Sequence, residues 1–462
     1  MHFKAHKSVL IYILTRIKMW KAMQRLLLNQ LQQWQQQQQR KPLLIDGARQ
    51  TGKTYLLKEL FGRSFKRVLR VDFLESPSMA DAFSGSLSPT DIITNLELLT
   101  NQSFNPETDL LILDEIGECE RAITALKYFA EQTPTWFVVA SGSNIGLLGS
   151  FPVGKVTQHI LRPFSFYEFL LASNEPALIK AFEQQLNNAA VHSKLMDKLT
   201  DYYFVGGMPE AVRVWYSLKD ESILHRIERV QQVQADLISG YQRDFGKYSG
   251  KVDANLIAAI FSAIPTQLAL VQDESVKRFQ FKEVYQRKSR YLELADGISW
   301  LEKSRLALKN YPVAGLVKSP LAAYKKENAF KLFLFDVGLL NHQLGASYQQ
   351  IKQQSYEYKG YVAENFVQQE LAALGIEPSY SWNDARAEIE FVLANAEGQI
   401  IPIEVKSGKR TRAKSLASFK QKCQPPKTIK LTGTQGSGPL EQVDFVYPLY
   451  YTQQAIRAHQ LL

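Results

Sequence analysis

The sequence lacks the features that mark disulfide-rich and membrane-spanning proteins. Only Cys119 and Cys423 occur among the 462 residues, which excludes a disulfide framework and a cysteine-based zinc site and suits a reducing cytosol. No stretch approaches the roughly 18 consecutive apolar residues of a membrane helix. The short apolar run at residues 8–14 is followed by Arg16 and Lys18 and by no small-residue cleavage site, unlike a signal peptide. We therefore expect a cytoplasmic protein with no membrane partner.

What remains is the composition of an ordinary globular protein, 45% apolar and 22% charged. The length suffices for about three domains. The net charge of +10 favours acidic partners such as nucleic acid, although a diffuse basic surface is the commoner cause of such a value. Composition therefore does not identify the function, which has to be inferred from the motifs.

The chain is organised around residues 47–54, which read GARQTGKT and fit the phosphate-binding pattern G-x-x-x-x-G-K-[ST]. Its glycines let the backbone turn so that successive N–H groups face a phosphate. Lys53 would reach the β- and γ-phosphates, and the Thr54 hydroxyl would hold Mg²⁺. An apolar strand candidate at 42–45 and a helix candidate at 55–61 argue against a chance match in a turn. The predicted nucleotide-binding residues of this loop are Gly47, Ala48, Arg49, Gln50, Thr51, Gly52, Lys53 and Thr54.

Two acids, Asp114 and Glu115, directly follow the apolar run at residues 110–113. A carboxylate at the C-terminal end of a buried parallel strand lies where open α/β sheets bind their ligands. Asp114 would therefore support Mg²⁺, and Glu115 would act as the general base that polarises the attacking water. The alternative is a core strand that meets a solvated acidic turn. The position of Asp114 on the next expected central strand after the P-loop favours the functional interpretation.

The middle of the chain, residues 176–250, has helical spacing that is interrupted at 203–210, where Gly-Gly and Pro mark a tight turn. Short helices are expected over 252–310. Two helices and a β-wing near 306–308 would make a winged-helix unit over 281–308, and its basic and aromatic interleaving suits contacts to a DNA backbone. A solvated helix face explains the same residues equally well. The basic residues are Lys277, Arg278, Lys282, Arg287, Lys288 and Arg290.

A second set of spaced acids lies between residues 357 and 432. Glu364 falls on an expected amphipathic helix, and Glu390 falls on the next expected strand. Glu404 and Lys406 lie two residues apart on the strand that follows, so their side chains share one face. A hairpin would bring Glu390 beside Glu404. Two carboxylates can hold Mg²⁺, and Lys406 can position a water or stabilise negative charge.

This order of elements is similar to the core of PD-(D/E)xK nucleases: a helix with Glu, a strand with an acid, a hairpin, and a strand with Glu-x-Lys. The spacing is loose, and Glu390 stands where Asp is usual, so one extra methylene shifts the carboxylate. The alternative is an inherited nuclease-like fold that is used only for binding or assembly.

Taken in order, the motifs resemble one family. They read GARQTGKT, LLILDE, GSN, RPFSFYEFL, YYFVGGMPEAV, GYQRDFGKY and EIEF…IEVKSG. Over roughly residues 20–450 the chain resembles the prokaryotic AAA-type ATPases with a C-terminal domain of unknown function. The resemblance implies an ATPase module that takes adenine nucleotides, a winged-helix-like middle and a nuclease-like C-terminal domain.

The resemblance also bears on individual residues. Ser143 and Asn144 follow an expected strand at 136–140, where AAA-type ATPases place a γ-phosphate sensor, although a helix N-cap fits equally well. Where the family commonly has Gly-Arg, this chain has Gly154 and Lys155, and lysine cannot offer the planar fork of an arginine finger. AAA-type proteins often act as rings, so the resemblance admits a homo-oligomer.

The predicted fold class is α/β: a P-loop NTPase parallel sheet with helices on both faces, then a helical and winged-helix-like region, then a smaller α/β nuclease-like domain. The expected segments are an N-terminal helical extension (1–40), the AAA-type ATPase domain (41–175), the winged-helix-like domain (176–320) and the PD-(D/E)xK-like domain (321–462).

The predicted function is Mg²⁺-dependent binding and hydrolysis of ATP, which gates a C-terminal half associated with double-stranded DNA. One alternative is a metal-dependent DNA nuclease or DNA-binding protein in which the nucleotide is a switch. Another is a scaffold of a defence or toxin–antitoxin system that binds ATP without hydrolysing it.

Overall fold

The computed structural model describes residues 23–147, 151–270, 278–353, 359–384, 387–407, 414–436, 439–440 and 442–461. The chain divides into two compact units. The P-loop unit comprises Gln24–Arg162 with Lys303–Arg305, and the C-terminal unit comprises Pro163–Glu302 and Leu306–Leu462. Most of the expected N-terminal extension lies outside the described residues, as do Lys277 and the final Gly408 of the IEVKSG motif.

The P-loop unit contains a five-stranded sheet in the order β2-β3-β4-β1-β5, with every neighbouring pair parallel. Strand β4 lies between β1 and β3, so the strand that carries Asp114 is not the direct neighbour of the strand before the P-loop. Strands β1 and β3 are buried along their whole length, as expected of apolar runs in a parallel sheet. The strands are β1 (Leu43–Asp46), β2 (Val68–Asp72), β3 (Leu110–Asp114), β4 (Phe137–Gly142) and β5 (Thr157–Ile160).

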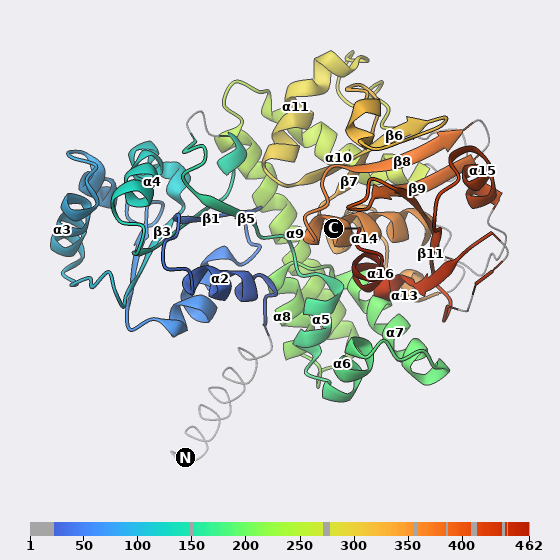
Figure 1. Ribbon diagram of the computed structural model, residues 1–462, viewed down its shortest axis with the longest axis horizontal. Coiled ribbons are helices and arrows are strands. Elements are labelled where there is room, and N and C mark those ends of the chain that lie inside the picture. Colours follow the sequence, from blue (N-terminus) through green and yellow to red (C-terminus); the bar gives the residue numbers. More distant parts are fainter. Residues whose placement is uncertain are drawn as a thin grey trace. The chain divides into compact units, whose positions relative to one another are not determined.

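Helices cover both faces of this sheet (Figure 1). Leu111 and Leu113 of β3 pack with α3 (Pro89–Thr100) and α4 (Glu120–Gln132). The alternate residues of β3 pack with α2 (Leu27–Gln35) and with the helix Tyr55–Phe61 that follows the P-loop. Since successive side chains of a strand point to opposite faces, the two clusters form two separate core layers. The predicted P-loop NTPase fold class is confirmed.

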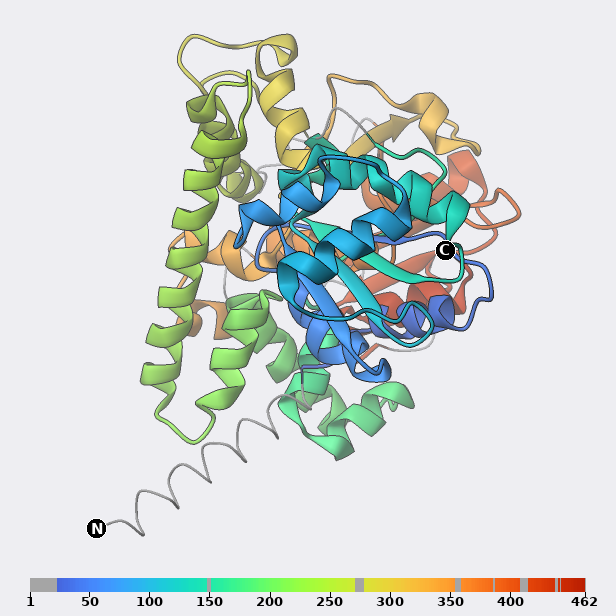
Figure 2. The ribbon, with the colours of Figure 1, turned by 90° about the vertical axis from the view of Figure 1, so that its left-hand side faces the viewer.

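The C-terminal unit begins with helices. The predicted turn at residues 203–210 is present between α7 and α8, and Gly207 allows a close approach there, because a Cβ atom on it would lie 2.2 Å from the carbonyl oxygen of Phe164. Helix α9 packs against α8 and α10 and is seen along its length in Figure 2. The helices are α5 (Phe166–Ser173), α6 (Pro176–Glu183), α7 (Ala189–Val205), α8 (Pro209–Ser217), α9 (Ile223–Tyr248), α10 (Ala254–Leu270) and α11 (Tyr291–Lys303).

A seven-stranded mixed sheet follows, in the order β12-β11-β10-β9-β8-β6-β7. Helix α14 packs against β7 and β10, and α15 packs against β9 and β10. The strands are β6 (Ala307–Ala314), β7 (Lys331–Leu334), β8 (Ser379–Asp384), β9 (Ala387–Ala394), β10 (Ile400–Lys406), β11 (Ile429–Thr432) and β12 (Phe445–Pro448). The remaining helices are α12 (Val337–Gln343), α13 (Tyr348–Lys352), α14 (Lys359–Ala373), α15 (Lys414–Cys423) and α16 (Thr452–Ala458).

The predicted β-wing near residues 306–308 is wrong in detail. These residues lead into β6, which pairs antiparallel with β7 and parallel with β8 inside the larger sheet. Every residue of β6 except Ala314 is buried, whereas a free wing would expose one face. Residues 281–308 also contain one long helix, α11, rather than two. Residues 281–308 therefore have neither the two helices nor the free wing of the predicted unit, and only the broader winged-helix-like assignment of residues 176–320 stays a prediction.

Within the part of the chain that the structure describes, each helix is too short or too polar to span a lipid bilayer.

Candidate functional site

The P-loop leaves the end of β1 and turns directly into the following helix. Gly52 has a φ of +90°, a region that side chains other than glycine rarely adopt. A Cβ atom on Gly47 would lie 2.4 Å from the carbonyl oxygen of Leu161, so only glycine fits there. Gln50 adopts a φ of +63° without being glycine. The glycines of the motif are therefore required by the backbone path, which leaves the loop shaped as a cradle.

Lys53 is buried inside this loop. Its Nζ donates to the carbonyl oxygens of Gly47 at 2.9 Å and Ala48 at 3.0 Å. Burial lowers the pKa of Lys53, although the carboxylates of Glu115, Asp46 and Asp114 act in the opposite direction. The ammonium group is thus held by two neutral acceptors of the loop itself.

Two arginines brace the loop from within the P-loop unit. Arg25 donates to the carbonyl oxygens of Thr51 at 2.7 Å and Arg162 at 2.6 Å. Arg305 donates through Nε to the carboxylate of Asp46 at 2.9 Å, and Asp46 is fully buried at the end of β1. These contacts fix both the start and the middle of the loop.

Asp114 ends β3 beside the P-loop. Its Oδ2 accepts a hydrogen bond from the Thr54 hydroxyl at 2.9 Å, and its Oδ1 accepts one from the Ser141 hydroxyl at 2.5 Å. A hydroxyl oxygen next to a carboxylate is an all-oxygen donor set, which fits Mg²⁺. Among the described residues no group of three or more His, Cys, Asp or Glu side chains is arranged to hold a metal ion. A cation at this site would therefore take its other ligands from phosphate and water.

Arg70 of β2 also contacts Asp114, and the sequence analysis missed it. Its Nε and Nη2 lie 3.0 and 2.9 Å from Asp114 Oδ2, and Nη2 also pairs with Asp72. Strand β2 lies directly beside β3 and Asp72 stands opposite Asp114 in the register. The signal available in the sequence was the polar alternation of Arg70 and Asp72 at the end of an apolar strand.

Glu115 and Ser143 are brought together across β3 and β4. The amide N–H and the hydroxyl of Ser143 lie 3.4 Å from Glu115 Oε2, and the hydroxyl accepts from Arg49 Nε at 3.3 Å. Glu115 has a φ of +49° and Asn144 has a φ of +61°. Two of the predicted residues, Glu115 and Ser143, therefore converge with Arg49 of the P-loop, and Asn144 follows in the same turn.

The second predicted site is assembled in the C-terminal unit. The buried carboxylate of Glu390 accepts from the amide N–H of Val405 at 2.8 Å and from Lys406 Nζ at 2.7 Å. Lys406 Nζ lies 4.0 Å from Glu404 Oε1. Burial lowers the pKa of Lys406, but the carboxylates of Glu390, Glu404 and Glu364 together outweigh it and raise the pKa. Burial, and then the charge of Glu390, raise the pKa of Glu404.

Further lysines face the remaining carboxylates of this cluster. Lys331 Nζ of β7 lies 3.1 Å from Glu364 and 2.7 Å from Glu388, and Lys430 Nζ lies 3.8 Å from Glu404. Burial raises the pKa of Glu364 although Lys331 opposes it. The sequence analysis missed Lys331, Lys430 and Glu388. Only Glu388 had a signal, since it lies two residues from Glu390 on one strand.

The structure thus gathers the predicted Glu364, Glu390, Glu404 and Lys406, and it pairs their carboxylates with lysines. This pairing opposes a metal ion, because each lysine already supplies the positive charge that a cation would bring. The metal-binding role of Glu390 and Glu404 stays a prediction.

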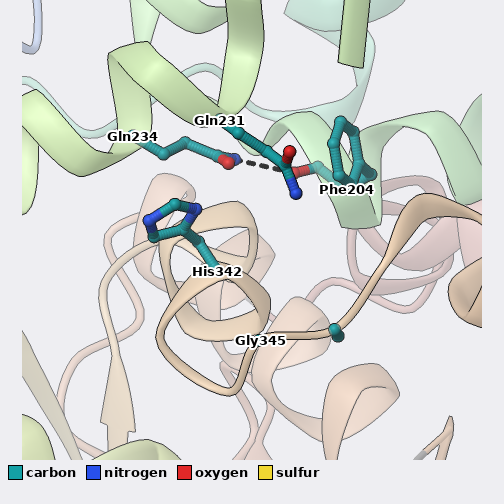
Figure 3. A pocket seen from close by; sticks show the side chains of 6 residues that line it. Phe204, Gln231, Gln234, His342 and Gly345 are labelled. Carbon is teal, nitrogen blue, oxygen red and sulfur yellow. Dashed lines mark hydrogen bonds between the residues drawn. The ribbon is translucent and has the colours of Figure 1, made fainter. Parts of the chain in front are cut away.

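A small pocket lies elsewhere in the C-terminal unit, between α9, α12 and the end of α7 (Figure 3). The side chain of Gln234 closes one side of it by donating to the carbonyl oxygen of Phe204 at 2.7 Å. Burial lowers the pKa of His342 on this wall. The volume of about 120 Å³ is below the roughly 300 Å³ of small ligand sites. The pocket is lined by Phe204, Gln231, Gln234, His342, Gly345 and Ala346.

Comparison with known protein families agrees with this geometry. The profile described as an AAA domain matches residues 39–170, which include all five strands of the P-loop sheet. Profiles of two domains of unknown function, DUF8612 and DUF4143, match residues 196–350 and 359–452. Residues 39–170 are therefore similar to AAA domains and have the fold of a P-loop NTPase, and they are followed by segments whose families carry no assigned function.

No curated protein matches the chain. Similar solved structures include Drosophila ORC bound to DNA (14% identity, TM-score 0.27, covering 69% of this chain and 84% of that one) and AMPPCP-bound DnaA from Aquifex aeolicus (13% identity, TM-score 0.26, covering 60% and 86%). C. elegans PCH-2 is similar at 13% identity with a TM-score of 0.21, covering 57% and 60%. At these TM-scores the likenesses carry no conclusion about this chain.

Proposed function

We propose that the chain is a cytoplasmic, Mg²⁺-dependent ATPase whose hydrolysis gates a DNA-associated C-terminal half. The observation that carries the proposal is the contact of 2.9 Å between the Thr54 hydroxyl of the P-loop and Asp114 at the end of β3. It joins a phosphate cradle to an acid placed for a metal. The AAA domain supports ATP as the nucleotide.

The backbone N–H groups of residues 47–54 would bind the phosphates, and Lys53 would exchange its two carbonyl partners for phosphate oxygens. This exchange is favourable because Lys53 is buried against neutral groups and gains an anionic partner. Bound Mg²⁺, held by Thr54 and Asp114, would neutralise charge on the phosphates.

Hydrolysis would need a base beside the γ-phosphate, and Glu115 is the candidate. As the water oxygen forms its bond to the γ-phosphorus, Glu115 would take the proton, and the bond from phosphorus to the bridging oxygen would break with its electrons remaining on ADP. Ser143, 3.4 Å from Glu115, would position the carboxylate, and Ser143 and Asn144 would sense the γ-phosphate.

Double-stranded DNA is the proposed partner of the C-terminal unit. The basic side chains between α10 and α11 support this partner, because those of Lys282 and Arg290 are 78% and 81% exposed. A homo-oligomer belongs to the same proposal, and light scattering with and without ATP tests it.

The test is ATP hydrolysis with and without double-stranded DNA, comparing wild type with Lys53→Ala and Glu115→Gln. We expect turnover that DNA raises and that both variants lose, while Glu115→Gln still binds ATP. Tight ATP binding without turnover in the wild type would instead indicate a switch or scaffold.

A second candidate function is metal-dependent cleavage of DNA by the C-terminal cluster. The observation that favours it is the convergence of Glu364, Glu390, Glu404 and Lys406 from α14, β9 and β10. Cleavage of linear DNA in Mg²⁺ or Mn²⁺, lost in Lys406→Ala and kept in Lys53→Ala, would establish it. An intact substrate under both metals would leave the cluster a structural role.

A further inference from the structure

Asp114 accepts more hydrogen bonds than the P-loop alone supplies. Its Oδ1 receives the Ser141 hydroxyl at 2.5 Å and the amide N–H of Glu115 at 3.2 Å. Its Oδ2 receives the Thr54 hydroxyl at 2.9 Å and two nitrogens of Arg70 at 2.9 and 3.0 Å. The carboxylate that the proposed function assigns to a metal is therefore already neutralised by an arginine.

Arg70 and Thr54 differ in what they can do beside a metal. A hydroxyl donates one hydrogen and keeps two lone pairs, so Thr54 can donate to Asp114 and still ligate a cation. A guanidinium has only donors and a permanent positive charge. Arg70 can therefore only compete with a cation for Asp114 Oδ2.

Arg70 also has other acidic partners, one in its own strand β2 and one shortly after it. Its Nη2 pairs with Asp72, and its Nη1 lies 3.4 Å from Glu75, whose side chain is 72% exposed. The Arg70 side chain itself is 24% exposed. The guanidinium can therefore withdraw from Asp114 toward solvent and keep carboxylate partners, which lowers the free energy needed for the movement.

We propose that Arg70 is a positioning residue that acts through Asp114, holding its carboxylate while no divalent cation is bound and competing with Mg²⁺ for it. The proposal rests on the proposed function and adds a form of regulation to it. Because of this competition, the nucleotide site requires a higher Mg²⁺ concentration than a site without this arginine. Mg²⁺ and nucleotide should therefore bind together.

The chain offers a matched control at the other end of the same two strands. Arg67 pairs with Asp109 at 3.0 Å, and Asp109 is as buried as Asp114, with both carboxylates 1% exposed. Asp109 precedes β3 and Asp114 ends it, so the two pairs lie at opposite ends of the strand. Arg67→Gln therefore removes a comparable ion pair without touching the nucleotide site.

The experiment is equilibrium binding of a fluorescent ATP analogue to the full chain, titrated with Mg²⁺ and independent of turnover. Arg70→Gln is expected to lower the half-saturating Mg²⁺ concentration about tenfold, the equivalent of one charged hydrogen bond. Arg70→Lys, which keeps the charge without the fork, should give a smaller decrease, and Arg67→Gln should give none. Arg70→Lys also serves if Arg70→Gln does not fold.

An unchanged or higher Mg²⁺ requirement in both Arg70 variants, with nucleotide still bound, overturns the role of Arg70 alone. An equal shift in Arg67→Gln overturns it too, since the effect would then come from loosening the sheet. A wild type that binds no nucleotide at any Mg²⁺ concentration overturns the proposed function itself.

Discussion

Two lysines, the buried Lys53 of the P-loop and the partly exposed Lys406 of the C-terminal cluster, have opposite environments. Lys53 donates to two neutral carbonyl oxygens, and burial lowers its pKa. Lys406 donates to the carboxylate of Glu390, which raises its pKa. A buried cation held by neutral groups gains from an anionic ligand, whereas one paired with a carboxylate has little left to gain. The ammonium groups therefore differ in their hydrogen-bond partners, which are carbonyl oxygens in the P-loop and a carboxylate in the C-terminal cluster.

The largest expected effect is on turnover. Lys53→Ala and Glu115→Gln should each lower the ATP hydrolysis rate by about a hundredfold or more, because one loses the phosphate contact and the other loses the base. A steady-state phosphate-release assay measures it. Lys58→Ala, an exposed lysine of the following helix, is the control and should hydrolyse ATP at the wild-type rate. Wild-type turnover in Lys53→Ala would contradict the role proposed for Lys53 and with it the contrast with Lys406.

The next largest expected effect is on the free energy of unfolding. It should differ between a substitution of Lys331 in the C-terminal cluster and one of Lys53 in the P-loop. Lys331→Met leaves the carboxylates of Glu364 and Glu388 without their shared cation and should lower the free energy of unfolding by about 3 kcal/mol. Lys53→Met removes a buried cation that donates to carbonyl oxygens and is not directly paired with a carboxylate of the described residues, and it should leave the stability within about 1 kcal/mol of wild type, or raise it. Urea unfolding without nucleotide checks both. A larger loss of unfolding free energy in Lys53→Met than in Lys331→Met would contradict the proposed contrast.

The pH dependence of stability extends the comparison to a buried carboxylate, Glu370. Burial raises the pKa of Glu370 to about 8, and the nearby Glu168 carboxylate adds to the shift. Since this folded-state pKa lies above the unfolded value, the contribution to stability is fully present below pH ~4.3 and is lost as pH rises through about 8. Glu370→Gln should therefore flatten the fall in unfolding free energy between pH 5 and 8 by up to about 1 kcal/mol per pH unit.

Thermal melts of wild type and Glu370→Gln across this range provide the measurement. The amide of Gln can still accept from the Phe166 N–H, which lies 2.9 Å from the carboxylate, so the fold should be kept. Parallel pH profiles of the two proteins would remove Glu370 as the cause.

The smallest expected effect concerns the alternative partner of Arg70. Glu75→Gln removes an exposed acceptor 3.4 Å from Arg70 and should change the half-saturating Mg²⁺ concentration by less than about twofold, because exposed pairs contribute little. The same nucleotide-binding titration measures it. A shift as large as that of Arg70→Gln would mean that Glu75, rather than Asp114, controls the arginine.

The P-loop and the acids after β3 could be predicted because their signals are local. The turn at residues 47–54 is encoded by the residues of the turn themselves. The run Leu110–Asp114 contains both the apolar residues of the buried strand and the acid that ends it. The capping box of Ser165 and Glu168 at the start of α5 rests on an equally local spacing of residues. The β-wing was misplaced because a short apolar run does not reveal whether its strand stands free or joins a larger sheet.

The sequence by itself therefore determined the position of the P-loop motif, the acid that ends β3 and which short segments would form strands. The tertiary structure decided which cation each carboxylate meets. Arg70 reaches Asp114 across 44 residues of chain, and Lys331 reaches Glu364 across 33. Such pairs depend on the register between strands and on the helix that packs over them, which segments far apart in the sequence specify only together. For that reason the two sites share residue types, while Lys53 meets carbonyl oxygens and Lys406 meets a carboxylate.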